Sequence, residues 1–173
     1  MEMQSETLPR IGISSCLLGE EVRHDGGHKR DAYLVGILGE MVAWVPACPE
    51  VEFGLGTPRE PIRLIRNKND PSVVRLLSRS GLEITARMQR FTRRRVRELA
   101  KENLSGYIVK KDSPSCGMER VKIWKDEKRG GSERNGQGVF TAELIRQFPN
   151  LPVEEEGRLH DSQLLENVRT MDF

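Results

Sequence analysis

Short apolar runs alternate along the chain with polar stretches that contain glycine or proline. Runs of this kind, rich in β-branched residues and bounded by turn residues, predict buried strands. We expect strands at residues 11–15, 42–45, 107–110 and 151–156, and shorter ones at 62–66, 73–77 and 121–124. The runs at 62–66 and 73–77 are expected to pair at an edge.

Apolar residues spaced three and four apart predict helices at residues 32–41, 85–103 and 140–148, the last ended by Pro149. Residues 46–61 (PACPEVEFGLGTPREP) hold four prolines and two glycines, so we expect a structured loop without a helix. A Gly-, Arg- and Ser-rich loop is expected to run from the strand at 121–124 to Gly138.

Alternating strands and helices predict an α/β domain with a mostly parallel central sheet flanked by helices, a Rossmann-like arrangement. A length of 173 residues favours a single domain. We place it at residues 10–160, after a flexible N-terminal segment (1–9) and before a C-terminal tail or helix (161–173). Ligands of such sheets bind at the carboxyl ends of the strands.

The composition is that of a globular protein, with 36% apolar and 31% charged residues and a net charge of +2. No run of roughly 18 apolar residues predicts a membrane span, and the N-terminus lacks the pattern of a secretory signal. A cytoplasmic location is the default expectation. Three cysteines argue against a disulfide framework. The sequence does not determine the oligomeric state, and a homo-oligomer is possible.

All three cysteines (Cys16, Cys48 and Cys116) fall where a predicted strand ends, each with Gly or Pro nearby. They could be unrelated buried thiols, since free cysteine is among the most buried residue types. Strand ends on one side of a parallel sheet also converge, which would bring the thiols into one site. Three thiolates suit a zinc ion with one open position, or a [4Fe–4S] cluster with one iron free of protein. His24, His28 and His160 are candidates for a fourth ligand.

The helix predicted at 85–103 has an apolar stripe and, opposite to it, a stripe of cations. The apolar stripe is Met88, Phe91, Val96 and Leu99, and the basic one is Arg87, Arg90, Arg94, Arg97 and Lys101. A solvated face of an amphipathic helix is the simpler interpretation. Against a net charge of only +2, the same stripe could hold RNA phosphates.

Three motifs together resemble the thiouracil desulfidase family, long known only as a conserved bacterial domain. They are ISSCLLG with RHDGGHKRD, VPACPEVEFGLGTPREP, and KDSPSCGMERVKIW with GVFTAEL, and the match runs from about Ile11 to His160. The chain departs from the family at His24, where tyrosine is more frequent.

The resemblance implies a [4Fe–4S] cluster on Cys16, Cys48 and Cys116, with the fourth iron open to the thiocarbonyl sulfur of the substrate. It implies hydrolytic desulfuration without net redox change. Glu50 matches the family's acid–base residue, and Ser113 matches a second residue that could relay a proton.

The resemblance also implies thiolated uracil as substrate, either 2-thiouracil, 4-thiouridine monophosphate or 4-thiouridine in tRNA. Related chains that continue into a second domain look like desulfidases acting on 4-thiouridine in tRNA. Arg59, with Thr57 and Arg63 nearby, could bind a nucleotide phosphate or RNA. Two alternatives stay open: a zinc-dependent hydrolase that uses the same three cysteines, and a non-enzymatic RNA-binding module.

Overall fold

The structure, a computed structural model, describes residues 8–128, 130–163 and 166. Most of the predicted N-terminal segment and much of the predicted C-terminal tail lie outside these residues. No helix in the described part of the chain is long and apolar enough to cross a membrane.

Four parallel strands form the first sheet, in the order β2-β1-β5-β8. Their bounds are Arg10–Ser14 (β1), Ala43–Ala47 (β2), Leu104–Val109 (β5) and Val153–Glu155 (β8). The predicted α/β class with a mostly parallel sheet is confirmed. Because β1 lies between β2 and β5 and is parallel to both, the segments that follow these three strands leave the sheet at the same edge.

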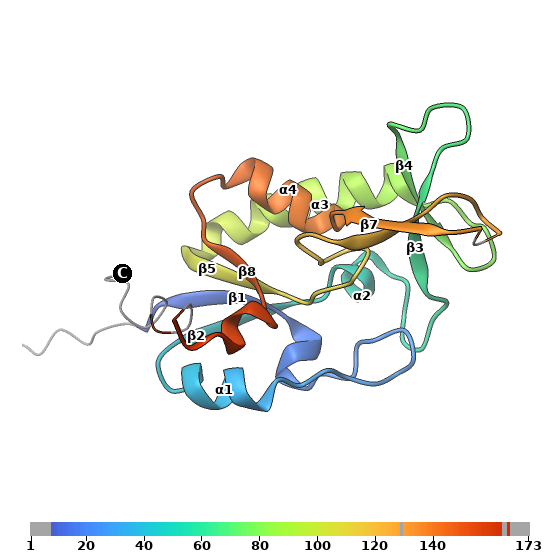
Figure 1. Ribbon diagram of the computed structural model, residues 1–173. Coiled ribbons are helices and arrows are strands. Elements are labelled where there is room, and N and C mark those ends of the chain that lie inside the picture. Colours follow the sequence, from blue (N-terminus) through green and yellow to red (C-terminus); the bar gives the residue numbers. More distant parts are fainter. Residues whose placement is uncertain (1–7, 129, 164–165, 167–173) are drawn as a thin grey trace, which may run out of the picture.

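Helices cover both faces of this sheet (Figure 1). Helix α1 (Ala32–Leu38) packs on one face through Leu34 and Leu38, which contact Ile11 and Ile13 of β1 in one buried cluster. Helices α3 (Thr85–Leu99) and α4 (Val139–Gln147) cover the other face. Short 3₁₀ turns follow β1 (Ser15–Leu18), α3 (Ala100–Glu102) and β8 (Arg158–His160).

A second sheet of four strands, in the order β4-β3-β6-β7, was not expected from the pattern. Its strands are Ile62–Arg66 (β3), Val74–Ser78 (β4), Val121–Trp124 (β6) and Ser132–Gly136 (β7). The predicted pair β3 and β4 is antiparallel, and β4 forms the edge. β7 lies where only a loop was predicted, because its sequence SERNG is polar and almost entirely exposed. Its backbone pairing with β6 makes it a strand.

Helix α3 joins the two sheets into one body. Met88 and Phe91, on its first half, pack against the second sheet, while Val96 and Leu99, on its second half, pack against the first. All four side chains are at most 9% exposed, which confirms the predicted apolar stripe.

Helix α2 (Pro49–Phe53) corrects the prediction of a helix-free loop at 46–61. Pro49 occupies the first helical turn, where a missing N–H costs nothing, and Gly54 ends the helix in the left-handed conformation. Phe53 packs edge-on against Phe91 of α3 at 5.8 Å between ring centroids. Tertiary packing therefore supports a helix too short to be stable alone.

Candidate active site

The three cysteines come together at the carboxyl edge of the first sheet. Cys16 lies in the 3₁₀ turn after β1, Cys48 directly follows β2 and caps α2, and Cys116 lies in the loop after β5. All three line one cavity of about 350 Å³, within the size range of small-ligand pockets. The three strand ends predicted to carry these cysteines therefore border one cavity.

Burial makes these thiols weak acids in the metal-free protein. It raises the pKa of Cys16 to about 11 and that of Cys116 to about 12, and it also raises the pKa of the half-buried Cys48. A bound cation would replace the three protons, since the thiolate is the metal-binding form.

The three sulfurs are not gathered around one point. Within residues 8–128, 130–163 and 166, no group of three Cys, His, Asp or Glu side chains is close enough together to hold a single metal ion. One zinc ion needs every ligand sulfur about 2.3 Å from the metal, which places the sulfurs within roughly 4 Å of one another. An iron–sulfur cluster binds each cysteine through a different iron and accepts wider spacing.

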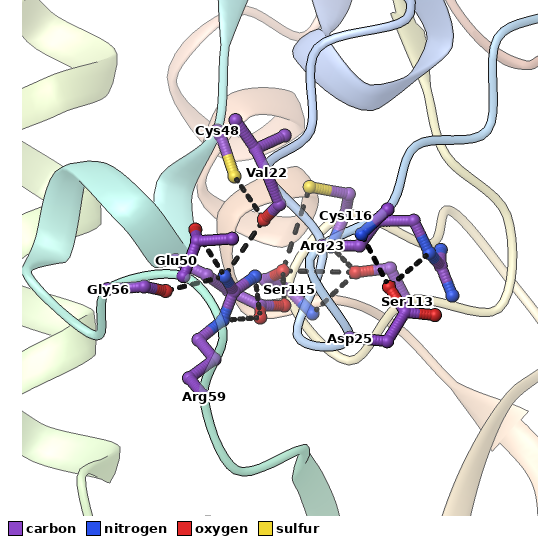
Figure 2. A network of polar contacts seen from close by, with 12 residues as sticks. Val22, Arg23, Asp25, Cys48, Glu50, Gly56, Arg59, Ser113, Ser115 and Cys116 are labelled. Atoms are coloured by element: carbon purple, nitrogen blue, oxygen red, sulfur yellow. Dashed lines mark hydrogen bonds and ion pairs between the residues drawn. The ribbon is translucent and has the colours of Figure 1, made fainter.

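Glu50 and Arg59 form a buried ion pair beside the cysteines (Figure 2). The Nε and Nη2 atoms of Arg59 donate to Glu50 Oε2 at 3.0 and 2.8 Å, and the two side chains are 6% and 13% exposed. Arg59 Nη1 also donates to the carbonyl oxygens of Val22 and Gly56, both at 2.8 Å. The predicted phosphate-binding residue is thus occupied by Glu50 and the backbone around it.

Two serines connect to the other oxygen of Glu50. Ser115 Oγ donates to Glu50 Oε1 at 2.7 Å, and it lies 3.0 Å from Ser113 Oγ. Ser113 Oγ accepts the backbone N–H groups of Ser115 and Cys116 at 3.3 and 3.1 Å. Each hydroxyl has one proton. Because Ser115 uses its proton on Glu50, Ser113 is the donor in the contact between the serines, and a chain of donors runs from Ser113 to Glu50.

The loop that carries Cys116 is held by the N-terminus of α4. Phe140 N donates to Ser115 O at 2.9 Å, and Thr141 Oγ1 donates to Cys116 O at 2.6 Å. Gly138 packs directly on this loop, because a Cβ added there would lie 2.4 Å from Ser115 O. The first N–H groups of a helix have no acceptor within the helix, and here one of them is satisfied by a carbonyl group of the loop.

Two carboxylates at the end of β8 bind the segments that follow β5. Glu156, 6% exposed, accepts Lys111 N at 2.8 Å and pairs with Lys110 Nζ at 2.5 Å. Glu155 Oε1 accepts Met118 N at 2.9 Å. The acidic run near the end of the chain therefore braces the loop that holds Cys116.

The remaining predicted residues lie in different places. His24 lines the cavity, whereas His28 and His160 do not. His28 Nδ1 accepts Arg30 N at 3.1 Å, and His160 Nε2 lies 2.6 Å from Asp31 Oδ2.

The α3 arginines stand apart from the cavity lining. Arg90, Arg94 and Arg97 are exposed, and among the described residues Arg94 pairs with Glu98 at 3.9 Å. Arg95, half-buried, pairs with Glu52 of α2 at 2.5 Å. Near the cavity, Thr57 lies beside Arg59, and Arg63 Nη2 donates to Glu127 O at 3.1 Å.

Sequence reasoning missed Ser115 and the pairing role of Arg59. A signal for Ser115 was present, since it stands directly before a predicted ligand in SPSC. No spacing rule links Arg59 to Glu50, because their contact depends on the conformation of the residues between them.

Comparison with known proteins agrees with this geometry. The model of the family described as 2-thiouracil desulfurase matches residues 11–156. The uncharacterized protein YbbK of Bacillus subtilis (strain 168) is 31% identical over 154 residues, which cover 87% of this chain and 98% of the relative. The solved structure of a [4Fe-4S]-dependent thiouracil desulfidase, TudS, is 30% identical with a TM-score of 0.71, covering 92% of this chain and 99% of that one.

Proposed function

The chain belongs to the 2-thiouracil desulfurase family, and we propose that it is a [4Fe–4S]-dependent desulfidase that hydrolyses the thiocarbonyl group of a thiolated uracil. The observation that carries the proposal is the cavity at the carboxyl edge of the first sheet, which Cys16, Cys48 and Cys116 line together with Glu50. In the balanced reaction, water replaces the sulfur by oxygen and hydrogen sulfide leaves, so that no electrons are transferred.

The donor set fits an iron–sulfur cluster. Three free thiols line the cavity, and thiolate sulfurs are the ligands that iron–sulfur clusters take from proteins. The similar protein TudS is named for its dependence on such a cluster. When bound to Cys16, Cys48 and Cys116, a [4Fe–4S] cluster supplies an iron with an open position, a Lewis acid for the soft sulfur of C=S.

Glu50 is the proposed general base. Its Oε2 is fixed by Arg59, which orients the carboxylate and leaves Oε1 as the acceptor for a proton from the attacking water. An ionised carboxylate only accepts hydrogen bonds, in keeping with its three present donors.

Ser115 and Ser113 are the proposed proton relay. The donor chain Ser113–Ser115–Glu50 reaches the cavity, which all three residues line. After Glu50 has taken a proton from water, both hydroxyls turn, so that Glu50 donates to Ser115, Ser115 donates to Ser113, and Ser113 gives its own proton to the departing sulfide. Ser113 keeps the role expected from the resemblance, and Ser115 adds the missing link between Ser113 and Glu50.

The substrate is proposed as a thiolated uracil, presented as base, nucleotide or tRNA. If tRNA is the substrate, the exposed Arg90, Arg94 and Arg97 of α3 are the proposed phosphate contacts. In that case turnover on thiolated tRNA falls steeply with salt, while turnover on 2-thiouracil does not. The three free thiols suit a reducing, cytoplasmic location.

The test is anaerobic reconstitution with iron and sulfide, followed by assays of sulfide release from 2-thiouracil and 4-thiouridine monophosphate. We expect a brown protein with about four irons per chain. Changing any one of the three cysteines to Ser should remove the cluster, whereas Glu50→Gln should keep the cluster and lose turnover. Glu83→Gln, at an exposed carboxylate outside the cavity, is the matched control. A colourless protein with stoichiometric zinc would contradict the proposal.

A further inference from the structure

Tyr107 is a buried hydrogen-bond donor whose hydroxyl has no partner within the described chain. The residue lies on β5 and is 2% exposed, yet its hydroxyl is unpaired. Leaving a buried hydroxyl unsatisfied costs about 1–3 kcal/mol, and most such groups in proteins find an acceptor. The position therefore calls for an acceptor that the side chains and backbone around it do not provide.

The ring is held in one place by its neighbours. Gly12 of β1 is the register partner of Tyr107, and a Cβ added to Gly12 would lie 2.2 Å from Tyr107 Cδ2. The ring thus occupies the space over β1 that any larger residue at position 12 would take. Phe140 of α4 packs on it at 5.7 Å between ring centroids. The hydroxyl is therefore carried by a fixed ring on the α3–α4 side of the sheet.

The ionisable groups that influence the pKa of the Tyr107 hydroxyl are two of the predicted cysteine ligands and the neighbouring pair of Glu52 and Arg95. Burial is the main cause that raises the pKa of Tyr107 well above its usual range, and Cys116, Glu52 and Cys48 add to the effect while Arg95 opposes it. A tyrosine hydroxyl carries its proton at neutral pH even without such a shift, so Tyr107 is a donor.

Glu52 is the carboxylate among these groups, and the Tyr107 hydroxyl makes no hydrogen bond to it. Glu52 Oε1 accepts Cys48 N at 3.1 Å, and Glu52 Oε2 accepts Arg95 Nε at 2.5 Å. Arg95 has only donors. The hydroxyl also makes no hydrogen bond to the sulfurs of Cys116 and Cys48 in the metal-free protein, although Cys116 shares a buried cluster with Tyr107. A protonated thiol is a weak acceptor, whereas a metal-bound thiolate carries charge and accepts hydrogen bonds well.

We propose that Tyr107 donates a hydrogen bond to the sulfur shell of the bound cluster, with Cys116 as the principal acceptor, and thereby adjusts the electron density on the cluster. The inference rests on the proposed function, because the acceptor forms only when the thiols give their protons up to iron. Hydrogen bonds to cluster sulfurs are one of the means by which proteins raise reduction potentials. The same withdrawal of electron density makes the open iron a stronger Lewis acid toward C=S.

The test compares Tyr107→Phe, which removes only the hydroxyl, with Tyr33→Phe at the only other tyrosine, which is 45% exposed. In the reconstituted protein we expect Tyr107→Phe to lower the reduction potential of the cluster, measured by voltammetry. Iron loss to a chelator should become about tenfold faster or more, as is typical when an outer hydrogen bond to a metal ligand is removed. Tyr33→Phe should leave both quantities at the wild-type values.

The cluster-free protein provides a second readout. There the hydroxyl has no acceptor, so Tyr107→Phe should leave the free energy of unfolding unchanged or raise it. Equal destabilisation with and without the cluster, or an unchanged potential, would overturn this inference alone. A wild-type protein that assembles no cluster would instead overturn the proposed function and this inference together.

Discussion

Ser115 Oγ donates to Glu50 Oε1 at 2.7 Å, linking the residue directly before one cysteine to the residue two positions after another. The contact joins segments 65 residues apart in the sequence. It means that the carboxylate proposed as the base is oriented from both sides, by Arg59 on one oxygen and by a serine on the other.

Replacing Ser115 by Ala should lower kcat for sulfide release by roughly 10²-fold, because the relay to Glu50 is interrupted. The cluster should remain, since the sulfur ligands are untouched. Sulfide release and visible absorption, measured on the same sample, check both parts. Ser132→Ala, at an exposed position of β7, is the control. Full activity in Ser115→Ala would show that protons reach Glu50 by another path.

Replacing Arg59 by Ala should lower the free energy of unfolding by about 3–5 kcal/mol, because the buried Glu50 carboxylate loses its cation. Arg59→Lys should recover part of the stability but not the orientation of Glu50, since a lysine cannot donate from two fixed nitrogens. Urea unfolding measures the stability, and kcat reports the orientation. Arg90→Ala, on the exposed face of α3, should change neither value for 2-thiouracil. A stable, fully active Arg59→Ala would refute the structural role.

Gly138→Ala should lower the free energy of unfolding, whereas Gly36→Ala should raise it. At Gly138 the new methyl group would lie 2.4 Å from Ser115 O, so we expect a loss of about 1–3 kcal/mol and weaker cluster binding. Gly36 lies inside α1 with nothing within 4 Å of the added Cβ, so alanine should stabilise by about 0.5–1 kcal/mol. Thermal unfolding of both variants tests the pair. Equal effects would mean that the close approach at Gly138 is not maintained in solution.

In the metal-free protein, Cys48 should react first with iodoacetamide at pH 8. Cys16 and Cys116 are only 8% and 7% exposed, and burial raises their pKa to about 11 and about 12, so that little of either is the reactive thiolate. Mass spectrometry of digests over time gives the three rates. In protein unfolded with urea, the three cysteines should be labelled at similar rates. Faster labelling of Cys116 than of Cys48 would contradict the burial seen in the fold.

Elements that follow from the local spacing of apolar residues could be predicted from the sequence. Elements that depend on contacts between distant segments could not. The strand ends that bear Cys16, Cys48 and Cys116 follow from short apolar runs, and the stripe of α3 follows from its periodicity. Helix α2 was missed because its prolines argue against a helix, although Pro49 at the first turn is compatible with one. β7 was missed because its residues show no apolar alternation.

The roles of two residues near the site changed for the same reason. Arg59 was expected to meet a phosphate, but the fold brings Glu50 and the Val22 carbonyl to its guanidinium. A glycine next to a predicted ligand, as Gly117 is, ordinarily lets the backbone turn close to a bulky cofactor. In the structure a Cβ there would lie 2.4 Å from Val121 Cγ2 and 2.9 Å from Ser113 O, so close packing of the loop already requires glycine.

The hydrogen bonds between the start of α4 and the Cys116 loop affect when, during synthesis of the chain, this loop takes its final conformation. Within the part of the chain that the structure describes, the carbonyl groups of Ser115 and Cys116 accept hydrogen bonds from Phe140 and Thr141. During synthesis on the ribosome, the nascent chain has already exposed Cys16 and Cys48 long before these residues emerge. The loop that carries Cys116 gains its hydrogen bonds to α4 only after residue 141 has been synthesised, so we expect the three cysteines to be positioned together late in synthesis.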